Sequence, residues 1–132
     1  MEIKIGNLTF DCRVSGNSND ELVLLLHGFP QTSCMWDRLM HDISAQGHYC
    51  IAPNLRGYSK GARPNGKEHY KVDALSKDVL DIAKYTGRDR FHLIGNDWGA
   101  VIGWKLVHDN PASVLSWTGL CIPHCRNWEE IR

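Results

Sequence analysis

An aspartate flanked by glycines stands at a change of pattern in this sequence. Residues 91–94 are largely apolar, residues 95–99 read Gly-Asn-Asp-Trp-Gly, and a further apolar stretch follows. This order predicts a strand, a sharp turn and a helix. Gly95 and Gly99 leave the room that the strand and helix backbones need to approach each other at such a turn. A carboxylate at its centre can displace a leaving group from an sp3 carbon, so we interpret Asp97 as a nucleophile.

Asp97 also has a simpler interpretation, as the N-cap of a helix. Asp is favoured just before the first helical turn, where it faces the positive end of the helix dipole. A cap alone requires neither a preceding apolar strand nor a glycine on each side. We therefore favour the nucleophile, and the cap stays the alternative.

A second apolar run ends abruptly in a loop marked by glycine and proline. Residues 22–26 read Leu-Val-Leu-Leu-Leu and are followed by His27, Gly28, Phe29 and Pro30. The pattern is typical of a buried parallel strand that enters a functional loop. A plain turn at the end of a strand is the alternative, but the order and spacing relative to residues 95–99 favour a functional loop. We expect His27 to brace this loop by hydrogen bonding and not to act as a base.

Together these motifs resemble the N-terminal half of an α/β-hydrolase of the Asp-nucleophile branch, and they are most similar to epoxide hydrolases. Residues 27–30 are similar to the epoxide hydrolase oxyanion loop, in which the bond before the proline is commonly cis. Residues 52–59 (Ala-Pro-Asn-Leu-Arg-Gly-Tyr-Ser) resemble the loop after the next strand. The chain departs from the pattern at Asn54, where Asp is usual, and at Asn96, where His is more frequent. We expect the first departure to affect a structural loop more than chemistry.

The resemblance implies a reaction and the residues that carry it. Asp97 would open an epoxide and form an alkyl-enzyme ester, which water hydrolyses to a diol. The backbone N–H groups of Phe29 and Trp98 would form the oxyanion hole, with Gly28 and Pro30 shaping the loop. No metal and no organic cofactor are implied, and the expected partner is a small-molecule substrate.

Two other functions stay open. Haloalkane dehalogenases share Asp-Trp at this turn and would use the Trp98 indole N–H to hold the leaving halide. They typically carry Asn where this chain has Phe29, so Phe29 favours an epoxide substrate. The second alternative is a non-catalytic, truncated member of the same fold.

The general base that hydrolyses the ester is not evident in this sequence. His108 and Asp109 fall about 15 Å along the helix from Asp97, too far to assist it. His124 is better interpreted as a loop histidine, because nothing acidic, Glu129 and Glu130 included, is placed to orient it. Tyr58 and Tyr70 precede the turn and are expected to pack. We therefore expect residues 1–132 to be the N-terminal part of the domain, without the cap domain and the C-terminal part of the core.

Composition agrees with an α/β protein of the cytoplasm. Fifteen Lys and Arg balance fifteen Asp and Glu, which argues against nucleic acid or an anionic membrane as partner. The N-terminus lacks a signal-peptide pattern, and no apolar stretch is long enough to span a bilayer. The five cysteines include no C-x-x-C pair. Cys50 and Cys121 lie in apolar runs, so we expect buried free thiols in a reducing compartment.

Hydrophobic periodicity predicts an α/β fold: a mostly parallel sheet with helices on both faces. We expect an antiparallel pair first, then a helix with Ser33 as its cap, an amphipathic helix ending near Gly87, and a strand after Pro111. Arg56 and Arg63 fit a structural loop. The last strand would be an open edge, which favours self-association. The expected strands are 3–5, 8–14, 22–26, 49–52, 91–94 and 114–122, and the first two helices are 34–45 and 70–85.

Overall fold

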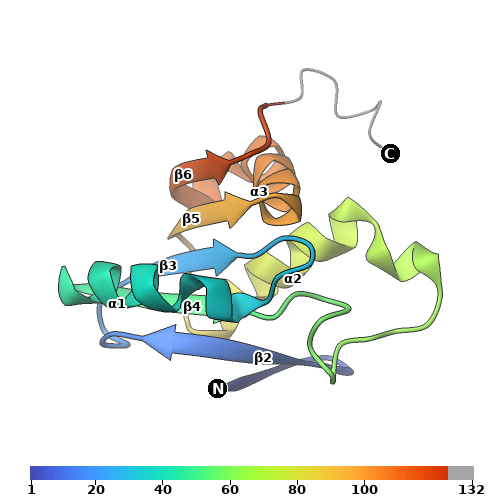
Figure 1. The fold of residues 1–132 in the computed structure, drawn as a ribbon, viewed down its shortest axis with the longest axis horizontal. Helices are drawn as coiled ribbons and strands as arrows, with labels where there is room; N and C mark the ends of the chain where they lie inside the picture. Colours follow the sequence, from blue (N-terminus) through green and yellow to red (C-terminus); the bar gives the residue numbers. More distant parts are fainter. Residues whose placement is uncertain (125–132) are drawn as a thin grey trace.

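A six-stranded sheet forms the centre of the computed structural model, which describes residues 1–124 (Figure 1). The strand order is β1-β2-β4-β3-β5-β6, with β1 and β2 antiparallel to their neighbours and the other four strands parallel. The expected mostly parallel α/β sheet is therefore confirmed. The strands are β1 (Glu2–Ile5), β2 (Leu8–Ser15), β3 (Glu21–Leu26), β4 (His48–Pro53), β5 (Phe91–Asn96) and β6 (Val114–Leu120).

Helices cover both faces of this sheet. They are α1 (Asp37–Ala45), α2 (Val72–Tyr85) and α3 (Trp98–Asp109), with short 3-10 helices η1 (Ser33–Trp36), η2 (Lys67–Tyr70) and η3 (Pro111–Ser113). Figure 1 shows α1 on one side and α2 and α3 on the other. None of the helices in residues 1–124 has the length and apolar character needed to cross a membrane.

The central strand β3 explains why its sequence is a continuous apolar run. Leu22, Leu24 and Leu26 pack toward α2 and α3 in the larger core, whereas Val23 and Leu25 pack toward Trp36 and Met40 in the smaller one. Successive side chains of a strand point to opposite faces, so a strand covered on both sides has no polar alternation. β3 thereby holds the loop that follows it on a rigid support.

The start of each of the first two predicted helices differs from the structure. The helix expected over 34–45 is divided into η1 and α1, and Ser33 lies inside η1 instead of capping it. The Ser33 N–H donates to Oδ1 of Asn54 at 2.9 Å, so a contact with the loop after β4 replaces a local cap. The second helix begins at Val72, because Lys71 is still extended.

The last strand is also shorter than expected. β6 ends at Leu120, and Cys121 has a φ of +72°, which a continuing strand does not permit. Cys121 is exposed, which corrects the expectation of a buried thiol there, whereas Cys50 is buried as expected. Within the described residues, β6 pairs with β5 only and forms an edge of the sheet.

Candidate active site

Asp97 lies on a strained turn between β5 and α3. Its φ of +56° and ψ of −120° fall outside the regions that L-residues ordinarily occupy, as the flanking glycines predicted. Asp97 stands at the N-cap position of α3, yet its side chain makes no cap hydrogen bond. A capping role therefore does not account for this carboxylate.

Three glycines permit this turn by leaving out a Cβ. A Cβ on Gly95 would collide with the carbonyl of Gly99, and one on Gly99 would collide with the carbonyl of Leu26. A Cβ on Gly28 would collide with Cβ of Asp97. The first two obstacles are backbone atoms, which cannot rotate away as a side chain can. The close approach of β5, α3 and the loop after β3 therefore requires glycine at these positions.

The loop after β3 brings a backbone donor to the Asp97 carboxylate. The N–H of Phe29 donates to Oδ2 of Asp97 at 3.0 Å, across 68 positions of sequence. The Phe29–Pro30 peptide bond is cis. The Phe29 side chain is 67% exposed, so this residue reaches Asp97 through its main chain. Trp98, the first residue of α3, is 53% exposed. The oxyanion role of the Trp98 N–H stays a prediction.

His27 is fully buried and connects two loops. The backbone N–H of Leu55 donates to Nε2 at 3.0 Å, and Nδ1 lies 3.0 Å from the carbonyl of Gly28. Since an N–H can only donate and a carbonyl can only accept, His27 is the neutral tautomer with its proton on Nδ1. Burial lowers the pKa of His27, opposed in part by the Gly28 carbonyl. These bonds match the bracing role expected from the sequence and leave no nitrogen free to act as a base.

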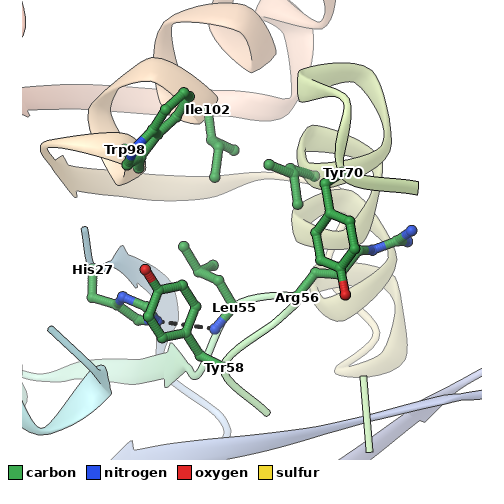
Figure 2. A pocket seen from close by; sticks show the side chains of 8 residues that line it. His27, Leu55, Arg56, Tyr58, Tyr70, Trp98 and Ile102 are labelled. Carbon is green, nitrogen blue, oxygen red and sulfur yellow. Dashed lines mark hydrogen bonds between the residues drawn. The ribbon is translucent and has the colours of Figure 1, made fainter. Parts of the chain in front are cut away.

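A pocket opens beside this turn, between the loop after β4 and the start of α3 (Figure 2). Its volume is about 230 Å³, and His27 and Trp98 line it on the side of Asp97. The other lining residues come from the loop after β4, from η2 and from the two helices of that face. These are Leu55, Arg56, Tyr58, Tyr70, Leu75 and Ile102.

The two tyrosines of this pocket were expected to pack, and Tyr58 does pack against the larger core. Tyr70 donates its hydroxyl to the carbonyl of Pro64 at 2.9 Å and is held by that bond. Tyr58 meets the His27 ring edge-on at 4.6 Å, and Figure 2 shows its hydroxyl pointing into the pocket on the side of Trp98. Burial, and next the negative charge of Asp97, raise the pKa of Tyr58. Nothing local in the sequence signals this, because the contact joins two separate loops.

A sheltered ion pair holds the loop that carries Tyr58. Arg56 donates to both carboxylate oxygens of Asp78, at 2.8 and 2.7 Å, and to the carbonyl of His69. Burial raises the pKa of Asp78, while the bonds from Arg56 act in the opposite direction. Arg63 donates to the carbonyls of Gly57 and Tyr58. Both arginines are thus structural, as the sequence analysis expected.

His108 and His124, the histidines that follow Asp97 in the sequence, contact residues other than Asp97. His108 and Asp109 interact with each other at the far end of α3. His124 packs edge-on against the Trp104 ring at 4.9 Å. Glu129 and Glu130 lie outside the described residues. Across residues 1–124, no hydrogen bond joins a histidine to Asp97, and Phe29 supplies the bond that its carboxylate accepts.

Comparison with known proteins finds similar hydrolases. Epoxide hydrolase 4 of Mus musculus is 32% identical over 124 residues, spanning 94% of this chain and 34% of that protein. Fluoroacetate dehalogenase of Burkholderia sp is 35% identical over 133 residues, spanning 98% of this chain and 43% of that protein. A crystal structure of an epoxide hydrolase from Vigna radiata superposes with a TM-score of 0.90 at 27% identity, covering 98% of this chain and 42% of that one.

The chain thus spans less than half the length of these relatives. A family model described as alpha/beta hydrolase fold matches residues 21–132. That match takes in β3, the turn at Asp97 and every helix between them. The chain belongs to the α/β-hydrolase fold family and resembles its epoxide hydrolases.

Proposed function

We propose that this chain carries the nucleophile of an epoxide hydrolase-type enzyme. An Asp97 oxygen bonds to an epoxide carbon as that carbon's bond to the ring oxygen breaks, and the ring oxygen takes up a proton. Water then adds to the carbonyl carbon of the resulting ester, which releases a diol and returns the carboxylate. The observation that carries the proposal is the Phe29 N–H bonded to Asp97 on a strained turn.

The same hydrogen bond suggests how the two carboxylate oxygens divide the work. Oδ2 accepts from Phe29, which leaves Oδ1 as the oxygen that attacks. Oδ2 then becomes the ester carbonyl oxygen and carries the negative charge when water adds. The N–H groups of Phe29 and Trp98 stabilise that charge, and the loss of one such donor typically costs about 3 to 4 kcal/mol.

Residues 1–124 account for only the first half of the proposed reaction, the formation of the ester at Asp97. Hydrolysis of the ester needs a base, and in α/β-hydrolases the acid and the histidine follow the nucleophile in the chain. We propose that these groups lie in another part of the protein. The 132-residue chain by itself would then be alkylated once at Asp97 and would stay as the ester.

A dehalogenase is the second candidate, and the similarity to fluoroacetate dehalogenase is the observation that favours it. The exposed indole of Trp98 could then donate to a departing halide. Phe29 separates the two candidates, because its apolar side chain offers a halide no hydrogen bond. A third candidate is a protein of this fold that binds and does not catalyse.

Intact mass measurement after incubation with excess styrene oxide tests the proposal. Cys34 and Cys121 are exposed thiols that also react with epoxides, and Cys125 is a further cysteine of the chain, so the experiment uses a C34S/C121S/C125S background. We expect a single added epoxide, mapped by peptide analysis to Asp97, and no adduct there in Asp97→Ala. Asp42→Ala, at an exposed carboxylate on α1, is the matched control and should be labelled like the parent.

Other outcomes decide against the proposal. If Asp97 carries no adduct in the parent protein, Asp97 is not the nucleophile. Release of halide from fluoroacetate or a bromoalkane, without epoxide labelling, would favour the dehalogenase. Repeated diol formation by the 132-residue chain would show that a base lies within it.

We further propose that the chain associates through the outer edge of β6. In residues 114–120 this edge has no strand partner, and Leu120 is 42% exposed. Light scattering at increasing concentration, with Thr118→Lys on β6 as the blocked variant, tests the association; a constant monomer mass would contradict it.

We also propose a reducing, cytoplasmic location, which the free cysteines of the described residues support.

A further inference from the structure

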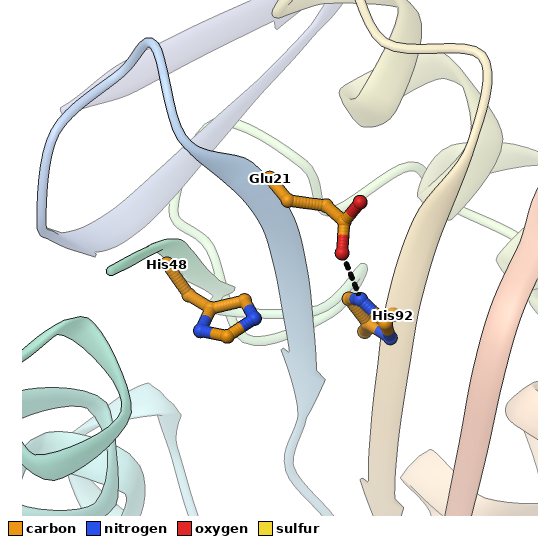
Figure 3. Close-up of side chains that lie close together, drawn as sticks. All are labelled: Glu21, His48 and His92. Carbon is orange, nitrogen blue, oxygen red and sulfur yellow. Dashed lines mark hydrogen bonds and ion pairs between the residues drawn. The ribbon is translucent and has the colours of Figure 1, made fainter. Parts of the chain in front are cut away.

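Three side chains of the types that can bind metal ions meet at the opposite end of the sheet from Asp97. Glu21 and His48 are the first residues of β3 and β4, and His92 is the second residue of β5 (Figure 3). The strand register explains why they meet. Glu21 pairs with His48, and His92 pairs with Val23, two residues after Glu21. Positions two apart on a strand share a face, so all three side chains stand on the α1 side of the sheet.

The geometry brings one ligand atom of each residue into a small volume. A carboxylate oxygen of Glu21 and one ring nitrogen of each histidine all lie within 4.8 Å of one another. His92 contacts Glu21 Oε1 through Nε2, and the two imidazole rings lie edge-on with centroids 5.7 Å apart. Figure 3 shows one ring nitrogen of His48 turned toward His92.

We propose that Glu21, His48 and His92 bind one divalent transition-metal ion of the Zn²⁺ type. Two imidazoles and a carboxylate are a donor set that suits Zn²⁺, whereas Mg²⁺ and Ca²⁺ prefer oxygen ligands. Metal–ligand bonds of about 2.1 Å in a tetrahedron separate the ligand atoms by about 3.4 Å. The half-exposed Glu21 side chain can rotate so that its oxygen moves from hydrogen-bond contact with His92 to this wider spacing, and water can take the fourth position.

The surroundings of the two histidines support this assignment. Ser116 lies beside His92 on β6, and its Oγ is 2.6 Å from Nδ1 of His92. This bond orients the ring so that Nε2 faces Glu21. Metal-bound histidines are commonly oriented by a hydrogen-bond partner on their other ring nitrogen in this way. Within the described residues no hydrogen bond competes for the His48 ring nitrogen that is turned toward His92 in Figure 3, so this nitrogen is open to a metal ion.

The charges around the cluster both favour and oppose a cation. Glu21 contributes a carboxylate to the cluster, and this group would attract a cation. Arg90 acts on the Glu21 charge and would repel a metal ion. Removal of Arg90 should therefore strengthen binding, an outcome that a simple Glu–His hydrogen bond does not predict.

The position of this site indicates a structural role. His92 and Asp97 are five residues apart on β5 and its turn, about 17 Å at the rise of a strand. A metal there would not touch the substrate proposed for Asp97. It would connect the amino ends of β3, β4 and β5 and hold them in register, which stabilises the fold without entering the chemistry.

Calorimetric titration with ZnCl₂ tests the proposal in a C34S/C121S/C125S background, where the cysteines that remain are Cys12 and Cys50, both buried. We expect one Zn²⁺ per chain and a melting temperature that rises with Zn²⁺ and not with Mg²⁺. Co²⁺ should give the visible d–d bands of a four-coordinate site without a thiolate charge-transfer band. Circular dichroism of each variant verifies that it is folded.

Variants distinguish this site from general surface binding. Ser116→Ala should weaken binding about tenfold, as loss of an outer partner does, and E21Q, H48Q and H92Q should weaken it further. Arg90→Gln should tighten it. His41→Gln, at an exposed histidine on α1 that also contacts a carboxylate, is the matched control and should change nothing. No heat and no thermal shift with ZnCl₂, or binding that persists in H48Q and H92Q, would overturn the proposal.

Discussion

The two ends of the parallel sheet are built in different ways. At the carboxyl ends of β3 and β5, Asp97 has a strained backbone and accepts a main-chain N–H from Phe29. At the amino ends, Glu21, His48 and His92 have ordinary backbone conformations and meet through their side chains. The first arrangement depends on where backbones can approach each other, and the second depends on which side chains the register places together.

The side-chain pairs at the two ends differ in the same way. The Arg56 and Asp78 side chains are only 13% and 8% exposed, whereas those of His92 and Glu21 are 25% and 56% exposed. A sheltered pair cannot exchange its partner for water, so the loss of one member leaves a desolvated charge. An exposed pair loses little, and its groups stay free to bind something else. The carboxyl end should therefore tolerate change poorly and the amino end well.

The largest effect should come from a methyl group at the turn. Gly99→Ala places a Cβ against the Leu26 carbonyl on the central strand, and we expect a loss of about 4 kcal/mol in the free energy of unfolding. Gly87→Ala is the control, because its φ is +78° but nothing lies within 4 Å of the added atom. It should cost about 1 kcal/mol. Urea unfolding of both variants measures the difference, and equal losses would show that the turn can relax.

The next effect should come from the sheltered ion pair. Arg56→Met leaves Asp78 buried without its partner, which should cost about 3 kcal/mol. The double variant R56M/D78L removes both charges and should recover most of that loss. Arg63→Met, in the same loop, removes bonds to two exposed carbonyls and should cost about 1 kcal/mol. Thermal and urea unfolding measure all three, and a double variant as unstable as R56M would contradict the argument.

The smallest effect should be a pH dependence from His27. Its pKa in the folded chain is lowered by burial, so the unfolded chain binds a proton first as the pH falls below about 6.5. Stability is therefore lost from that pH downward until the pKa of folded His27 is reached. The slope contributed by this one proton is at most about 1.4 kcal/mol per pH unit.

Urea unfolding between neutral and mildly acidic pH measures this slope. His27→Asn keeps an amide donor near the Gly28 carbonyl, carries no titrating group and should flatten the slope. His41→Gln, at an exposed histidine, should leave it unchanged. A slope that persists in His27→Asn would place the pH dependence on another group.

Local patterns in the sequence predicted those features that depend on local backbone geometry. The glycines around Asp97 predicted the strained turn, because a Cβ at Gly95 or Gly99 would strike a backbone carbonyl. The unbroken apolar run of residues 22–26 predicted a strand buried on both faces, which β3 is. Such features are visible in sequence because each restricts the residue type at its own position.

Features that depend on contacts between distant segments were decided only by the tertiary structure. The Ser33 N–H bonds to Asn54 instead of being part of a local cap, so the predicted start of that helix was wrong. Tyr58 faces the pocket because its loop folds against His27. Glu21, His48 and His92 form no motif along the chain, and only the register of β3, β4 and β5 brings them together. A pattern of residue types carries local constraints, whereas the pairing of separate strands and loops is set by the packing of the whole sheet.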